Sequence, residues 1–189
     1  MPDINTMPVS LAENWWAMWL LSATLVVAAV IDGWKLRVPN WITFPLIFSG
    51  WIYSAVYFGW VGLAWSVLGT IVGLGLLLPA YAIGGMGAGD VKLLAGIGAW
   101  AWSGATLYAF CISALIGGVI AVGMVLWRRD WHHHSAQFWA ITAEILEIRD
   151  PNTLSSIAAQ RKSQMLLLPY GIPIAIGTIS YFLWMGIMT

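Results

Sequence analysis

The chain has 189 residues, 60% of them hydrophobic and only 8% charged, and its formal net charge is zero. A soluble domain of this size carries about a quarter charged residues, so the composition predicts an integral membrane protein with one domain over 1–189. Eight basic residues without a basic stripe argue against a nucleic-acid partner. The single cysteine, Cys111, excludes an intramolecular disulfide and a C-x-x-C zinc site.

Apolar runs long enough to cross a membrane, about 20 residues each, recur along the chain. The run 91–126 is too long for one span, and Trp102-Ser103-Gly104 is the turn signal that divides it. Pro169 and Pro173 lie near the start of the last run, where they kink the helix or leave its first turn irregular. We therefore expect an all-α polytopic fold with six transmembrane helices, at 15–32, 41–58, 63–83, 90–102, 105–127 and 165–185.

The polar segment 128–164 is expected to form a cytoplasmic loop. Within it, the stretch 137–149 places its isoleucines and Phe138 on one helical face, which predicts one interfacial amphipathic helix. We interpret His132-His133-His134, beside Arg128 and Arg129, as a surface that contacts lipid headgroups. Adjacent histidines on a helix point in different directions, and no acid or cysteine cluster supports a metal site.

The cations are distributed unevenly along the chain. Every Lys and Arg falls in the segments that follow the first, third and fifth spans: Lys35, Arg37, Lys92, Arg128, Arg129, Arg149, Arg161 and Lys162. By the positive-inside rule these three loops are cytoplasmic, and both termini lie outside.

Two aspartates border the predicted spans on the cytoplasmic side. Asp32 ends the first span, and Asp90 begins the fourth directly after the glycine-rich stretch 84–89. An acid there is costly in a membrane and is therefore a functional candidate. Two carboxylates at similar depth on different helices can converge and share a proton, so that one accepts a proton from water while the other donates one. The pattern favours aspartic protease chemistry.

The surroundings of the two aspartates leave a structural alternative open. Glycines in the stretch 84–89 would let an extended peptide or the partner aspartate approach the backbone. Alternatively, Asp32 forms a solvated salt bridge with Lys35 or Arg37, and Asp90 forms one with Lys92.

The segment Gly87-Ala88-Gly89-Asp90 is a G-x-G-D motif at the start of a span, and Val91-Lys92-Leu93-Leu94 follows it. Together with Asp32, with Arg37-Val38-Pro39-Asn40 downstream of it, and with the Pro169-Tyr170-Gly171 segment, it resembles the prepilin peptidase family of intramembrane aspartyl proteases. Within that family the chain is most similar to the short CpaA/TadV-like branch. The resemblance covers nearly the whole chain.

The resemblance implies a site and a reaction. Asp32 and Asp90 would be the catalytic pair, acting without metal or other cofactor, and the adjoining loop and substrate-contact positions would be Gly87, Gly89, Lys92, Pro169, Tyr170 and Gly171. The reaction would remove the basic leader from a type IV prepilin or pseudopilin, in the bacterial inner membrane and on its cytoplasmic face. Larger members also N-methylate the new terminus through an extra cytoplasmic region with paired cysteines. Neither is present here, so we expect peptidase activity alone.

Two other functions fit part of the pattern. G-x-G-D proteases of the presenilin or signal-peptide-peptidase kind share the motif, but they carry a Pro-Ala-Leu segment and more spans. A small transporter or assembly subunit would use the two aspartates to bind a cation or a proton, because acids near a broken helix also serve ion coupling.

Overall fold

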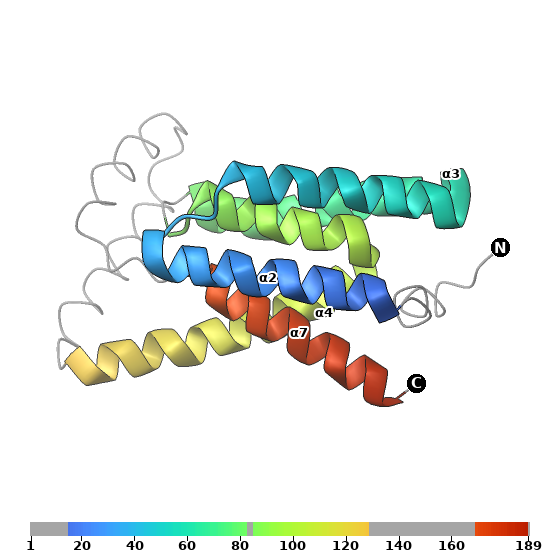
Figure 1. Cartoon of the computed structure of the whole chain (residues 1–189). Helices are drawn as coiled ribbons and strands as arrows, with labels where there is room; N and C mark the ends of the chain where they lie inside the picture. The colour runs from blue at the N-terminus through green and yellow to red at the C-terminus, as the bar shows by residue number, and fades with distance from the viewer. Residues whose placement is uncertain (1–14, 83–84, 129–168, 189) are drawn as a thin grey trace.

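The computed structural model describes residues 15–82, 85–128 and 169–188, and these residues are almost entirely α-helical (Figure 1). Three helices are long and apolar enough to cross a membrane, and a shorter apolar helix follows them. In chain order the helices are α2 (Trp15–Lys35), α3 (Asn40–Ala82), α4 (Ala88–Arg128) and α7 (Gly171–Met188). The prediction of an all-α membrane protein is confirmed at this level.

Helices α3 and α4 are each broken in the middle, and the chain reverses direction at both breaks (Figure 1). In α3 the break is at Gly59, whose φ of 64° costs a glycine little. In α4 it is at Trp102, with φ 61°, at the turn signal that the sequence showed. A non-glycine residue there costs about 1–3 kcal/mol, so its surroundings must hold it. The Trp102 indole N–H donates to the Ser54 hydroxyl at 3.2 Å, and its ring meets that of Phe58 edge-on.

Because of these reversals, the end of α2, both ends of α3 and of α4, and the start of α7 lie toward one end of the bundle (Figure 1). Helix α2 begins and α7 ends at the opposite end. The gathered end includes the last turn of α2, the first turns of α4 and α7, and the cations Lys35, Arg37 and Lys92. It is the polar end of an otherwise apolar bundle.

The second half of α3 packs on the first half of α4 through close backbone contacts at glycines. A Cβ built on Gly69 would overlap the Gly98 carbonyl oxygen, and one on Gly98 would overlap the Gly69 carbonyl oxygen. A Cβ on Gly73 would lie 2.5 Å from the Leu94 carbonyl oxygen. The buried Ser66 hydroxyl donates to the Ala99 carbonyl across the same interface. Small residues that bring backbones together are a characteristic means of helix association in lipid.

Helix α7 connects α2 to the second half of α4. Its Gly177 lies against Ser113 of α4, whose hydroxyl donates to the Ala109 carbonyl at 2.6 Å and to the Ile174 carbonyl at 3.4 Å. On α2, Leu21 and Leu25 are completely buried. Helix α2 therefore packs on α7, whereas α3 packs on α4.

The helix ends differ in places from the predicted spans. Helix α2 continues past residue 32 to Lys35, and it closes where Leu36 takes a φ of 50° and donates its N–H to the Asp32 carbonyl at 2.7 Å. Helix α7 begins at Gly171, after Pro169, and α4 continues through Arg128. The predicted amphipathic helix at 137–149, His132–His134 and most of the loop 128–164 lie outside the described residues.

The glycine contacts between α3 and α4 can be tested with a matched pair of substitutions. We expect Gly69→Ala to lower the free energy of unfolding by about 1–3 kcal/mol, because the new methyl group meets backbone that cannot move independently. Gly75→Ala, on the same helix with open space around it, should be neutral or slightly stabilising. Thermal unfolding in detergent, followed by helical circular dichroism, measures both. Equal stability of the two variants would contradict this packing.

Candidate active site

Asp32 lies in the last turn of α2 and points into the bundle. Its side chain is only 2% exposed, and its Oδ2 atom accepts the Gly171 backbone N–H at 2.8 Å. A Cβ on Gly171 would lie 2.9 Å from both Cβ and Oδ2 of Asp32. A glycine at position 171 is therefore what lets the start of α7 approach this carboxylate.

Asp90 is the third residue of α4 and is 5% exposed. Its Oδ2 atom accepts the Gly87 N–H at 3.1 Å, and its own N–H donates to the Gly87 carbonyl at 3.2 Å. A side chain at this position that reaches back to the residue before the helix is one half of a capping box. Asp90 therefore stabilises the start of α4, whatever else it does.

The end of α2 and the start of α4 are held together by a backbone contact. A Cβ on Gly89 would lie 2.6 Å from the Val38 carbonyl oxygen and 3.0 Å from the Val38 nitrogen. Val38 belongs to the short connection between α2 and α3 and is itself buried. The second glycine of the G-x-G-D motif thus presses the segment after Asp32 against the helix that carries Asp90.

Tyr170 directly precedes α7 and lies near both aspartates. Burial, together with the negative charge of nearby Asp90, raises the pKa of the Tyr170 phenol above its ordinary value. The next residue, Gly171, donates its N–H to Asp32. Both carboxylates therefore border the Tyr170-Gly171 dipeptide, one on each residue.

Each carboxylate also lies at the amino end of a helix. Asp90 is in the first turn of its own helix, and Asp32 accepts an N–H from the first residue of α7. The N–H groups of a first helical turn have no partner inside the helix, and the helix dipole favours negative charge beside them. These contacts stabilise charge at two positions where burial alone would oppose it.

The described cations at this end do not pair with Asp32. Lys35 and Arg37 are both exposed, and no ion pair joins either of them to that carboxylate. The Lys92 ammonium donates to the Asn40 side-chain oxygen at 3.0 Å and lies 4.9 Å from the centre of the Phe44 ring. Lys92 therefore ties α4 to the start of α3.

The remaining predicted positions belong to the backbone of the site. Pro169 accepts the Ile172 N–H at 3.1 Å and thereby starts α7. Sequence reasoning gave no role to Val38 or Asn40, although both lie in the segment 37–40 that it singled out. Over residues 15–82, 85–128 and 169–188, no group of three or more His, Cys, Asp or Glu side chains is placed to hold a metal ion.

The chain is similar to a known family of membrane peptidases. A family model described as the type IV leader peptidase family matches residues 19–122, which include both aspartates. A prepilin leader peptidase/N-methyltransferase of Aeromonas hydrophila is 34% identical over 136 residues, covering 67% of this chain and 46% of that protein. Proteins of the same name from Neisseria gonorrhoeae and Escherichia coli K12 are 38% and 33% identical, over 56% and 60% of this chain and 39% and 53% of their own.

The chain spans about half the length of these curated relatives. No solved structure matches it. The family model nevertheless covers more than half of the 189 residues, including Asp32, the G-x-G-D motif and the helices that carry them. The chain belongs to the type IV leader peptidase family.

Proposed function

We propose that this chain is a membrane aspartic endopeptidase that removes the basic leader peptide from type IV prepilins or pseudopilins. One observation carries the proposal: two buried carboxylates, on different helices, border the same dipeptide at the polar end of an apolar bundle. The names of the matched relatives supply the substrate class.

In the proposed reaction the two carboxylates share one proton. The ionised aspartate takes a proton from a water molecule while the water oxygen attacks the carbonyl carbon of the scissile bond. The protonated aspartate donates its proton to the carbonyl oxygen. The tetrahedral intermediate then collapses: the C–N bond breaks, the leaving amine takes up the proton gained from water, and the hydroxyl formed from the carbonyl oxygen returns its proton to the second aspartate as the carbonyl re-forms. The backbone N–H groups of Gly171 and Gly87 fix the two carboxylates during these steps.

The proposed topology has six spans, with 1–14 and the end of α7 outside and the site facing the cytoplasm. Its support is the pair of chain reversals at Gly59 and Trp102, which divide α3 and α4 into antiparallel halves. The cations Lys35, Arg37 and Lys92 gather at the same end as both aspartates, as the positive-inside rule requires of a cytoplasmic face. The membrane proposed for it is the inner membrane of a bacterium.

We further propose that cleavage proceeds without N-methylation, as in the short CpaA/TadV-like branch. The relatives are named for both activities. A single cysteine in 189 residues cannot supply paired cysteines. Intact-mass measurement of the mature product, after cleavage in the presence of a methyl donor, should give the unmodified terminus. A methylated product would contradict this.

Replacing either aspartate should abolish cleavage. We expect Asp32→Asn and Asp90→Asn each to reduce conversion of a co-expressed prepilin by at least 1,000-fold, because the pair can then no longer exchange a proton. Asparagine still accepts the backbone N–H bonds, so the protein should remain in the membrane at its normal level. Conversion is followed by the size shift on a gel.

Lys35→Gln and Arg37→Gln are the matched controls for that experiment. Both residues are exposed at the same end of the bundle, and we expect cleavage within about threefold of the parent chain. Cleavage that survives in both aspartate variants would refute the assignment. A transport defect without any peptide cleavage would favour the cation- or proton-binding subunit instead.

The contact between Gly89 and Val38 predicts a second effect on cleavage. Gly89→Ala places a methyl group against the Val38 backbone, so it should separate the helix end that bears Asp32 from Asp90 and lower kcat at least tenfold. Gly104→Ala, also on α4 but with open space around it, should leave kcat unchanged. Purified variants reconstituted in vesicles provide the rates. Equal rates would show that this contact does not position the site.

A further inference from the structure

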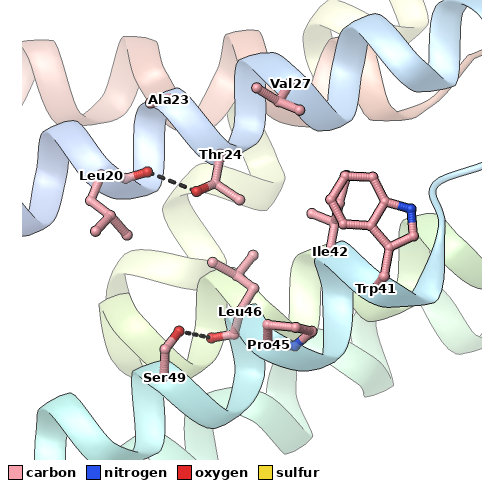
Figure 2. Close-up of a pocket in the computed structure, with 9 residues that line it drawn as sticks. All are labelled: Leu20, Ala23, Thr24, Val27, Trp41, Ile42, Pro45, Leu46 and Ser49. Carbon is pink, nitrogen blue, oxygen red and sulfur yellow. Dashed lines mark hydrogen bonds between the residues drawn. The ribbon is translucent and has the colours of Figure 1, made fainter.

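An apolar groove separates α2 from the first half of α3 (Figure 2). It encloses about 440 Å³ and is formed by the facing sides of residues 20–27 and 41–49. Val27 and Trp41 lie at one end of it, and Leu20 and Ser49 lie at the other (Figure 2). The volume lies within the range of about 300–1,000 Å³ that is usual for ligand sites.

Contacts between elements flank the groove at both ends. At the end near the polar face, the connection between α2 and α3 is fixed by Val38 under Gly89. At the far end the Trp16 ring of α2 meets the Tyr53 ring of α3 edge-on, with ring centres 5.6 Å apart. The α3 side of the lining runs from Trp41 to Ser49, which is about 12 Å along the helix axis, or roughly two turns.

The chemistry of the lining restricts what can occupy the groove. Thr24 and Ser49 are its only hydroxyl side chains, and their donors are used within their own helices, to the Leu20 carbonyl at 2.9 Å and the Leu46 carbonyl at 3.1 Å. Among the other lining residues, Trp41 alone carries a polar side-chain atom, its ring N–H. The lining therefore offers a peptide few hydrogen-bond partners, which favours an α-helix, whose backbone groups pair with one another, over an extended strand.

The groove leads to the candidate active site. Val27 and Asp32 are five residues apart on α2, about 7.5 Å along the helix axis. About two extended residues cover that distance. On the other side, Trp41 and Ile42 follow Val38, which contacts the helix that carries Asp90. A helix that lies in the groove and unwinds past Val27 would bring its next residues to the two carboxylates.

We propose that the α2/α3 groove binds the apolar helix of the prepilin-type substrate, immediately on the membrane side of the scissile bond. This inference rests on the proposed function. It assigns substrate binding to α2 and α3, outside the G-x-G-D loop. It also makes the groove a specificity site, which admits an apolar helix and offers an extended or polar segment few hydrogen-bond partners.

Two neighbouring valines provide a matched test. Val27 lines the groove, whereas Val26 is about 100° around the helix from it and does not, and their side chains are 48% and 50% exposed. In reconstituted protein, we expect Val27→Trp to lower kcat/KM for a leader joined to an apolar helix at least tenfold, mainly through KM. Val26→Trp should stay within twofold of the parent chain. Equal effects of the two substitutions would overturn the proposal.

Cross-linking tests the same contact without requiring cleavage. In a Cys111→Ala background, which removes the only cysteine, Val27→Cys or Val26→Cys is combined with Asp90→Asn to keep the substrate intact. The substrate carries one cysteine in its apolar segment. On oxidation, the yield of the disulfide between protein and substrate should be at least tenfold higher for Val27→Cys than for Val26→Cys. Equal cross-linking would mean that lipid fills the groove, and would overturn the proposal.

The two measurements also separate this inference from the proposed function. If the parent chain cleaves no prepilin, the proposed function fails, and cross-linking alone decides whether the groove binds an apolar helix. If the parent chain cleaves and the two valine positions behave alike in both assays, the proposed function stands and the groove assignment fails.

Discussion

The bundle depends on close backbone approach at glycines. Inside lipid the hydrophobic effect does little to bring helices together, so van der Waals contact and interhelical hydrogen bonds must do so. Gly69 and Gly98 allow the α3 and α4 backbones to touch, and the Ser66 hydroxyl adds a hydrogen bond across the same interface. Both α3 and α7 pack on helix α4, which carries Asp90. The segment after Asp32 also contacts α4, at Gly89.

Glycines also allow close contacts at the polar end of the bundle, beside the two aspartates. Gly89 admits the Val38 backbone, and Gly171 admits the Asp32 side chain. The Gly171 contact places Asp32 beside an N–H of the α7 amino terminus, and Asp90 accepts the Gly87 N–H at the start of its own helix, which favours the ionised form of both. Burial favours the protonated form. A pair of acids subject to both influences can hold one proton between them, which is the condition that general acid–base hydrolysis requires.

Much of this arrangement could be predicted from local sequence, and the rest depends on contacts between distant segments. The break at Trp102 follows from an adjacent serine and glycine, and Asp90 was placed by the glycines before it. The partner of Asp32 is 139 residues away, at Gly171, and no local pattern specifies that contact. Apolar run length predicts an end of the first span at 32, but backbone hydrogen bonds do not stop where the apolar residues do, and helix α2 continues to Lys35.

The separation of α2 from α3 was the least predictable feature. A connection of four residues, 36–39, normally joins neighbouring helices that pack on each other. Here α2 packs chiefly on α7, α7 packs on α4, and α4 packs on α3, so the short connection joins the two ends of this series of helices. Asp32 lies on the first helix of the series and Asp90 on α4, and the contact of Val38 with Gly89 brings the segment after Asp32 to the start of α4. The weak direct packing of α2 on α3 leaves the groove between them, which begins about one and a half turns from Asp32 along α2.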